Sequence, residues 1–384
     1  TTTDSGSDVP VETIVRRSRR AKPAPSSIPL RDDASVPPMS EEQRLVWLDL
    51  EQSSDPCIYN ETCTLHCLGI YDHDVMTRSV HALLLRHEIL RTTFCAPAGG
   101  DPVQRIHADA EVSLPSHDLS QICVDDRIAE AGRIAAEDAA TPFRLSEMPL
   151  FRGRVFRIGE RDHRLYLTIH HLLFDGDSLQ RVLMPELVEL YEAALEGRDP
   201  ELKPLSLQYG DYAAWQGGEP ASSRHGEQLA YWRERLAGEL PVLDLPADRP
   251  RPAVRSGAGA VETIVIPADL LGRLREVGRA AGVSLYMVVL ASYAAVLHRW
   301  SGQDDLTIGG IVSTLRRPEL RRTAGLFLNT VVLRLAPPAD LSFRSLLTQV
   351  RDCVLEAMEH SEVPFGLVAR NLSGGARGGR DGLF

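Results

Sequence analysis

The sequence predicts an α/β protein of two lobes, and three observations support this. Short segments in which apolar and polar residues alternate, as in strands, are followed along the chain by longer segments with helical periodicity. The length of 384 residues exceeds what one hydrophobic core usually organises. A stretch rich in proline, glycine and charge, Gln216 to Gly259, separates two such series. We therefore expect an N-terminal lobe at 39–215, a connection at 216–260 and a C-terminal lobe at 261–384.

Residues 1–38 precede the first lobe and are rich in serine, threonine, proline and charge. This composition predicts a linker, with one short helix from Val11 to Arg20. Periodicity then predicts the elements of the N-terminal lobe. They are a helix capped by Ser40, a strand at Tyr59–Leu68, a helix at Val75–Leu90, a strand at Pro102–Ile106, a helix at Val124–Ala140 and a strand at Leu150–Ile158.

The next stretch, His163 to Gln180, reads HRLYLTIHHLLFDGDSLQ. Apolar and polar residues alternate up to His170, which predicts a half-buried strand. Neighbouring side chains on a strand point to opposite faces, so His170 and His171 cannot share one cavity unless the strand has ended. We expect one histidine to be active and the other to brace it.

Turn residues follow at Asp175 and Gly176. Ser178 or Asp177 is expected to cap the helix that comes next, and Pro185 is expected to kink it because proline lacks the donor for an intrahelical bond. The predicted C-terminal lobe has a strand at Val261–Ile266, a helix at Ala268–Ala281 and a long buried helix at Ser284–Trp300.

Composition excludes several classes of protein. A total of 42 basic against 53 acidic residues gives a net charge of −11, which argues against nucleic-acid binding. No apolar run is long enough to cross a bilayer and no signal peptide is recognisable, so we expect a cytoplasmic protein without membrane contact. The six cysteines lack a CxxC pair, and Cys63, His66 and Cys67 would fall on both faces of a strand, so no metal site is expected.

Six short strings carry a family resemblance, and the central one is HHLLFDG at His170–Gly176. Taken alone, this string also fits a metal site or two satisfied core histidines. The others are SEEQRLVW from Ser40, RHEILRTTF from Arg86, YGDYAAW from Tyr209, GLFLNTVVLR from Gly325 and HSEVPFGLV from His360. In this order, over Met39 to Val368, they resemble the signatures of nonribosomal peptide synthetase condensation domains, of the chloramphenicol-acetyltransferase-like superfamily.

The resemblance implies two α/β sandwich lobes that form a V with a tunnel between them. It implies an acyltransferase of antibiotic and other natural product biosynthesis that forms peptide bonds. An acceptor aminoacyl amine would attack a donor acyl or peptidyl thioester. Both substrates would be carried on the phosphopantetheine arms of an upstream and a downstream carrier domain, with no cofactor bound directly. The chain would be a monomeric segment of a larger synthetase, and 1–38 would come from an upstream carrier domain.

A thioester is already activated, so no protein nucleophile is needed, and the sequence contains no GxSxG elbow. Histidine can accept a proton near neutral pH, which makes His171 the expected catalytic or amine-orienting residue. His170, Asp175, Gly176, Arg86 and Arg91 are expected to support it. Gly176 is expected to do so by allowing the turn and a close approach of the substrate. The resemblance also suggests residues that line the tunnel or the substrate: Tyr209, Asp211, Trp215, Ser313 and Asn329.

Two departures from the family pattern stand out. Leu315 occupies the place of an arginine in the family string IGxPVAxR, and this arginine is the usual charge partner of the motif aspartate. We expect a substitute arginine beside Asp175, namely Arg316, Arg86 or Arg91, or else backbone donors of the following helix. Family members also continue into further strands, so we expect the C-terminal lobe to be incomplete at its end.

Other functions stay open. A condensation-like domain that only recruits a partner would keep the fold and lose the chemistry. An epimerising or product-modifying relative would keep HHxxxDG, although epimerising relatives depart from RHExLRTxF and YxDYAxW. A soluble acyltransferase using free coenzyme A would share the histidine string but not the other strings. Heterocyclising relatives carry a paired-aspartate motif that this chain lacks.

Overall fold

The computed structural model describes residues 27–372, except 33–34, 98–99, 250–258, 316 and 338–341. The predicted helix at Val11–Arg20 therefore lies outside the described residues. The chain divides into two compact units, each discontinuous in sequence. We call residues 27–224 with 313–328 the histidine unit, and the described parts of 225–312 and 329–384 the C-terminal unit. Residues 313–328, expected in the C-terminal lobe, thus belong with the histidine unit.

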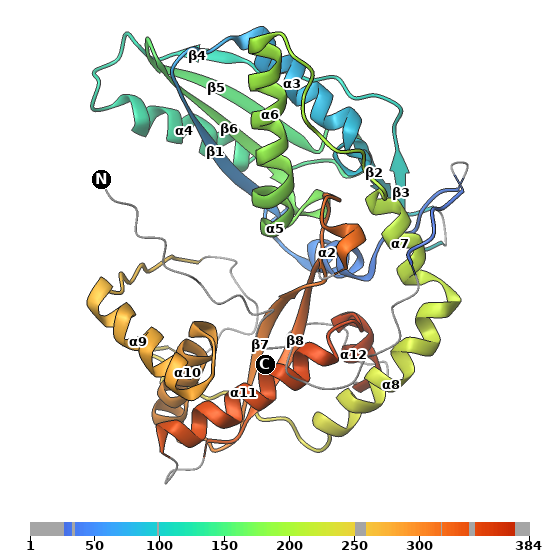
Figure 1. The fold of residues 1–384 in the computed structure, drawn as a ribbon, viewed down its shortest axis with the longest axis vertical. Helices are drawn as coiled ribbons and strands as arrows, with labels where there is room; N and C mark the ends of the chain where they lie inside the picture. Colours follow the sequence, from blue (N-terminus) through green and yellow to red (C-terminus); the bar gives the residue numbers. More distant parts are fainter. Residues whose placement is uncertain are drawn as a thin grey trace. The chain divides into compact units, whose positions relative to one another are not determined.

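A four-stranded sheet in the order β1-β6-β5-β4 forms the centre of the histidine unit (Figure 1). Its strands are β1 (Asn60–Leu68), β4 (Ser116–Asp118), β5 (Phe151–Gly159) and β6 (Asp162–His170). β6 pairs antiparallel with both β1 and β5, whereas β4 pairs parallel with β5. This mixed pairing confirms the α/β fold class.

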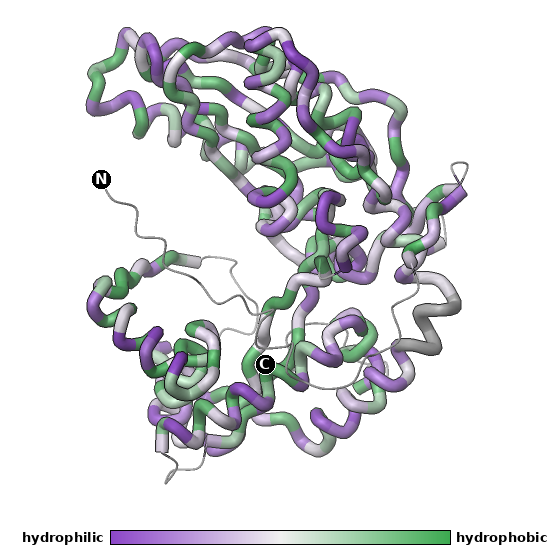
Figure 2. The backbone as a smooth tube through the Cα atoms, viewed as in Figure 1, coloured by the Kyte–Doolittle hydropathy of each residue, from purple (hydrophilic) through white to green (hydrophobic). Residues whose placement is uncertain are grey.

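Helices cover both faces of this sheet. Leu165, Leu167 and Ile169 of β6 point into the main core, which also contains side chains of α3 (His73–Arg86) and α6 (Met184–Glu196). The other face is covered by α4 (Arg127–Ala139), where Phe156 of β5 packs against Ala131. Figure 2 shows hydrophobic and hydrophilic residues alternating along α3 and α6, as expected for helices with one buried side.

Several smaller elements belong to the same unit. They are α2 (Glu41–Gln52), the 3₁₀ turn η1 (Glu88–Arg91) and the hairpin of β2 (Thr92–Cys95) and β3 (Val103–Ile106). Ser40 and Gln43 form a capping box at the start of α2, as its sequence predicts. The described end of the predicted linker packs here too, because Ile28 is buried and Arg31 pairs with Glu88 at 2.6 Å.

The chain after the histidines differs from expectation. Asp175, not Ser178 or Asp177, caps the short helix α5 (Gly176–Ser178). A π-helical turn, Leu179–Leu183, leads from α5 into α6. Pro185 is the second residue of α6 and comes directly after this π-helical turn, so the helical hydrogen-bond pattern is irregular just before the proline, which lacks the N–H for an intrahelical bond.

Residues 313–328 pack on α7 (Tyr209–Gly217). This segment contains the 3₁₀ turn η4 (Pro318–Leu320), and the ring of Tyr209 covers Gly325. A Cβ atom at position 325 would lie 1.9 Å from Cδ2 of Tyr209, so only glycine fits beneath this ring.

The C-terminal unit contains helices around a two-stranded sheet of β7 (Leu306–Ser313) and β8 (Leu328–Leu335). Its helices are the later part of α8 (Glu219–Arg235), α9 (Ala268–Ala281), α10 (Leu285–Ser301), α11 (Phe343–Glu359) and α12 (Phe365–Leu372). Among the described residues, no single helix is long and apolar enough to cross a membrane, although α9 and α10 pass that test together as a pair bent by 101°.

Two expectations for this unit were wrong. Residues 261–266 form no strand, because no described segment pairs with them, and Val261 is 91% exposed. α10 is buried on one face only, with Tyr286, Tyr293 and Trp300 each at least half exposed on another. Both segments are rich in apolar residues, which favours a strand or a buried helix. Such residues become buried only where another surface packs against them.

Candidate functional site

The strand β6 ends at His170, and His171 begins a 3₁₀ turn, Leu173 being its last residue. The backbone N–H of His171 donates to the carbonyl of Tyr59 at 2.9 Å, and the ring of Tyr59 stacks on the imidazole with 6.2 Å between centroids. The change of conformation separates the two histidines. His170 is 1% exposed, whereas His171 is partly exposed.

The hydrogen bond of His171 defines its tautomer. Nδ1 lies 2.8 Å from the carbonyl oxygen of Phe174. A carbonyl oxygen can only accept, so Nδ1 carries the proton. In the neutral ring Nε2 therefore keeps its lone pair, which is the arrangement that a general base or an amine-orienting acceptor requires.

His170 has the opposite arrangement, since its Nδ1 accepts from the backbone N–H of Leu172 at 3.2 Å. Burial, with a smaller contribution from His171, lowers the pKa of His170 from 6.5 to about 3. The ring is thus neutral near pH 7 and holds the first turn after the strand. This geometry supports the predicted division between an active and a bracing histidine.

Asp175 is completely buried and is bound by neutral donors. Its Oδ1 accepts from the backbone N–H of Ser178 at 2.7 Å and lies 2.9 Å from the Ser178 hydroxyl oxygen. Its Oδ2 accepts from the backbone N–H of Phe327 at 2.7 Å. Burial raises the pKa of Asp175, although these bonds oppose the shift.

The expected arginine beside Asp175 is not found among the described residues. Arg86 instead binds Glu186 at 2.8 Å and the carbonyl of Lys203 at 2.6 Å. Arg91 donates to the carbonyl of His107. Arg316 lies outside the described residues, and Leu315 packs against the main core. The alternative prediction of backbone capping is correct for Ser178, but a second donor comes from a distant segment.

Three consecutive residues of the 313–328 segment are held by side chains near the histidine loop. Gly325 accepts from the Ser178 hydroxyl at 2.8 Å, and Leu326 accepts from the hydroxyl of Tyr209 at 2.7 Å. Phe327 donates to Asp175, as described above. Ser178 was expected only as one of two alternative caps, but its position three residues after Asp175 is a recognisable capping-box signal.

A buried polar network connects α2 to the same region. Gln43 donates to the carbonyl of Leu172 at 3.0 Å, and Ser40 lies 2.8 Å from the hydroxyl of Tyr209. Between them, Glu42 accepts two bonds of 2.9 Å from Gln216. Burial raises the pKa of Glu42 from 4.5 to about 7. Sequence analysis did not single out Glu42, because acids in the first turn of a helix are usually exposed.

Gly176 is not required by its backbone conformation. Its φ is not among the positive values, and a Cβ atom there would meet nothing within 4 Å. The expected need for glycine in the turn was therefore wrong. The open space at this position is consistent with the other expectation, that a substrate approaches closely there.

The five residues suggested as lining have partners within their own units. Tyr209 and Asp211 are buried, and Asp211 accepts from the backbone N–H of Arg31 at 3.1 Å. The guanidinium of Arg317 lies 4.5 Å from the ring centre of Trp215. Ser313 accepts from the N–H of Leu315, and Asn329, in the C-terminal unit, donates to the carbonyls of Ser361 and Val363.

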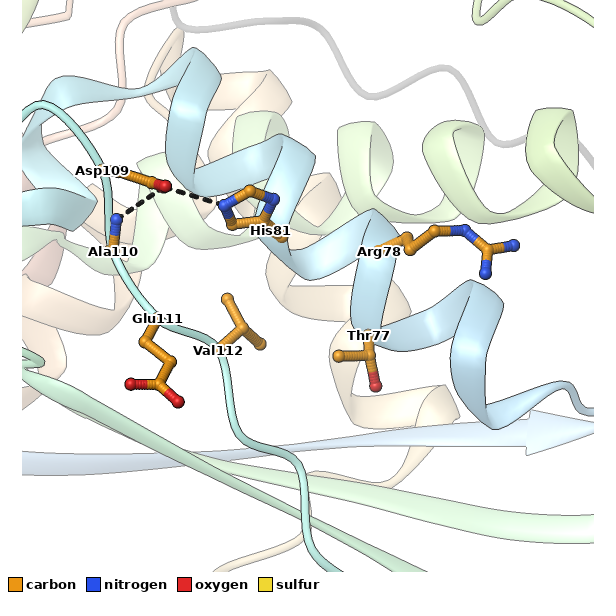
Figure 3. Close-up of a pocket in the computed structure, with 7 residues that line it drawn as sticks. All are labelled: Thr77, Arg78, His81, Asp109, Ala110, Glu111 and Val112. Carbon is orange, nitrogen blue, oxygen red and sulfur yellow. Dashed lines mark hydrogen bonds and ion pairs between the residues drawn. The ribbon is translucent and has the colours of Figure 1, made fainter.

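Neither of two cavities in the histidine unit has His170 or His171 in its lining. One of about 510 Å³ lies between α3 and the loop at Asp109–Val112, where His81 contacts Asp109 at 2.8 Å (Figure 3). The other, of about 370 Å³, is lined by Arg152 and Arg154 of β5. Within the described part of the chain, no group of three or more His, Cys, Asp or Glu side chains could hold a metal ion.

The chain is similar to known proteins in sequence and in fold. The sequence model described as "Condensation domain" matches residues 34–384. The chain is 38% identical over 338 residues to a protein of the linear gramicidin synthase of Brevibacillus parabrevis, covering 88% of the chain and 6% of that protein. It is 41% identical over 348 residues to phosphinothricin tripeptide synthetase PhsC of Streptomyces viridochromogenes, covering 90% of the chain and 32% of that protein. The chain thus spans a small part of these relatives.

Solved structures with the same fold include condensation domains. The first condensation domain of the calcium-dependent antibiotic synthetase, in complex with a substrate analogue, has a TM-score of 0.75 and 26% identity, covering 90% of this chain and 78% of that one. A complex of the X-domain and OxyB from teicoplanin biosynthesis has a TM-score of 0.78 and 28% identity, covering 93% of this chain and 77% of that one.

Proposed function

Because this chain belongs to the condensation domain family, we propose that it joins an acceptor amine to a donor acyl or peptidyl group carried as a thioester. The observation that carries the proposal is the tautomer of His171. Its Nδ1–H is bound to the carbonyl of Phe174, so its Nε2 offers a lone pair at the end of β6. The similarity to proteins of peptide synthetases supports the same reaction class.

In the proposed reaction the amine nitrogen attacks the thioester carbonyl carbon. The new C–N bond forms and the C–S bond breaks, which yields an amide and a thiol. His171 Nε2 accepts or orients a proton of the attacking amine, and that proton finally resides on the departing sulfur. Such assistance is typically worth roughly 10²- to 10⁴-fold, and holding two tethered substrates together contributes as much or more.

The substrates of this proposal are carried on phosphopantetheine arms of an upstream donor and a downstream acceptor carrier domain. The chain would act as a segment of a larger synthetase, as the small share of its relatives that it spans suggests. We propose that the two carriers reach His171 from opposite sides of a tunnel. The cytoplasmic location also stays a prediction.

A second candidate is recruitment of a partner protein without chemistry. It is favoured by the similarity to an X-domain that was solved in complex with OxyB. Leu315 supports it too, since this position lacks the arginine expected from the family pattern. The backbone bonds to Asp175 weigh against it, because they hold the histidine loop without that arginine.

One experiment separates these candidates. Loaded donor and acceptor carriers are incubated with the chain, and intact-protein mass spectrometry follows the transfer of the donor acyl mass to the acceptor. Transfer that is lost in His171→Ala supports condensation. Absence of transfer with every carrier pair tested, together with binding of a partner protein, would favour recruitment. Equal turnover of thioesters of free coenzyme A would point to a soluble acyltransferase.

A further inference from the structure

Two buried polar atoms beside the histidine loop have no hydrogen-bond partner. They are Nε2 of His170 and Oδ1 of Asn60. A buried polar atom without a partner is destabilising, so native proteins rarely leave two of them side by side.

The chemical character of each atom follows from its neighbours. Nδ1 of His170 accepts from Leu172 N–H, so the proton of the neutral ring is on Nε2, which makes Nε2 a donor. The amide nitrogen of Asn60 donates to the carbonyls of Ala139 and Thr141 at 2.7 and 2.9 Å. The remaining oxygen, Oδ1, is an acceptor. One unused donor thus accompanies one unused acceptor.

Strand register brings these two side chains together. Asn60 of β1 lies directly opposite His170 of β6 in the antiparallel pair. The next pair is joined by the bond from His171 N–H to Tyr59 O, so Asn60 and His170 form a non-hydrogen-bonded pair. In such pairs the side chains share one face, with Cβ atoms about 4.5 to 5.5 Å apart.

The surroundings of the pair are closed and partly polar. The ring of Phe143 meets the His170 ring edge-on, at 6.1 Å and 78°. The guanidinium of Arg152 lies 3.9 Å from the centre of the same Phe143 ring, and the buried Nε–H of Arg152 also lacks an acceptor. Arg152 is diagonal to His170 on β5, since its direct partner is Thr168. A third polar group therefore faces this part of the α4 side of the sheet.

An occupant of this place must accept a hydrogen bond from His170 and donate one to Asn60. An anion cannot donate and a metal cation cannot accept, whereas water does both. We propose that one water molecule is bound between Nε2 of His170 and Oδ1 of Asn60, and that Asn60 is thereby a positioning residue for His171. The water fixes the ring of His170, whose Nδ1 holds the turn on which His171 lies. The effect on His171 chemistry rests on the proposed function, but the water site does not.

The site itself is tested on the wild-type chain by X-ray diffraction at about 1.5 Å. We expect a water oxygen 2.7 to 3.2 Å from both atoms. In ¹⁵N NMR spectra, the ring of His170 should show protonated Nε2 and unprotonated Nδ1 at pH 7. A direct contact between His170 Nε2 and Asn60 Oδ1, an empty gap, or a proton on Nδ1 would overturn the proposal.

Matched variants test the positioning role. Asn60→Leu removes the acceptor, whereas Thr62→Leu adds the same side chain at an exposed position two residues along the same strand. We expect the water in crystals of Thr62→Leu but not of Asn60→Leu. Carrier-to-carrier transfer by Asn60→Leu should fall about tenfold in kcat with little change in KM, as a small misplacement of a catalytic group does.

Asn60 also binds the carbonyl of Ala139 at the end of α4, so Asn60→Leu could lose activity through unfolding. Its activity is therefore compared with a measurement of its folding. Circular dichroism and the unfolding midpoint of both variants show whether each folds. If Asn60→Leu folds and retains wild-type kcat, the positioning role is wrong even where the water is present. If the wild-type chain transfers nothing, the proposed function fails, while the diffraction and NMR results still decide the water site.

Discussion

Oδ2 of Asp175 accepts a hydrogen bond of 2.7 Å from the backbone N–H of Phe327, a residue 152 positions further along the chain. This bond joins the histidine loop to the 313–328 segment. The partner is thus a neutral backbone N–H, whereas the family pattern predicts a charged arginine side chain. The carboxylate anchors backbone groups of two segments, so we expect the role of Asp175 to be structural.

Replacement of Asp175 tests this role. Asp175→Ala leaves the N–H groups of Ser178 and Phe327 buried without an acceptor, so the free energy of unfolding should fall by about 2 to 5 kcal/mol. Asp175→Asn keeps one acceptor oxygen and should lose less. Denaturant titration measures both. An unchanged unfolding midpoint in Asp175→Ala, together with lost turnover, would show instead that the carboxylate takes part in the chemistry.

Two glycines give opposite expectations. Gly325→Ala places a methyl group against the ring of Tyr209, and such overpacking typically costs about 1 to 3 kcal/mol. Gly176→Ala meets no neighbour, so its stability should stay within about 1 kcal/mol of the wild type. Thermal unfolding compares the two variants. If substrate occupies the space beside Gly176, that variant loses turnover while it stays folded.

A double variant tests whether the loss of stability in Gly325→Ala comes from its contact with Tyr209. Combining Gly325→Ala with Tyr209→Leu removes the ring that the methyl group meets, so the double variant should be more stable than the sum of the two single losses predicts. Additive losses would mean that the contact with Tyr209 is not the cause.

His171 is expected to affect turnover and not folding, since its side chain is partly exposed. His171→Ala should lower carrier-to-carrier transfer by roughly 10²- to 10⁴-fold, which is the usual range for loss of a general base. The control is His81→Ala, which removes a partly exposed histidine of α3 that does not contact the histidine loop in any described hydrogen bond. Near wild-type transfer by His171→Ala would exclude a role in proton transfer.

Glu42 is expected to make stability depend on pH. Burial raises its pKa from 4.5 to about 7, so the folded protein binds this proton more tightly than the unfolded chain does. The resulting stability is fully present below pH 4.5 and is lost as the pH rises through 7. The free energy of unfolding of the wild type, relative to Glu42→Gln, should fall by roughly 3 kcal/mol over this interval.

Urea titrations between pH 4.5 and 8 measure this difference. Glu41→Gln is the control, because Glu41 is the neighbouring residue in the same first turn of α2 and is less buried. A difference between wild type and Glu42→Gln that is independent of pH would contradict the shifted pKa.

Local patterns predicted the histidine strand well. β6 ends at His170 as expected, because alternation stops there and turn residues follow. The partner of Asp175 could not be predicted, since a backbone N–H is present in almost every residue and leaves no mark in the sequence. For residues 261–266, by contrast, the sequence predicted a strand that the structure does not form. Their β-branched residues favour a strand, but a strand also needs a neighbour to pair with.

Residues 313–328 belong to the histidine unit although they follow residues 225–312 of the C-terminal unit in the sequence. This arrangement affects the order in which the parts of the histidine unit can fold during synthesis. Residues 27–224 leave the ribosome well before the donor of Asp175 has been made. At about 5 to 20 residues per second, the 152 positions between Asp175 and Phe327 take roughly 8 to 30 s. During that interval the aspartate lacks its second anchor and Tyr209 has no glycine beneath its ring. The histidine loop therefore reaches its final geometry only after residues 225–312 of the C-terminal unit have been made.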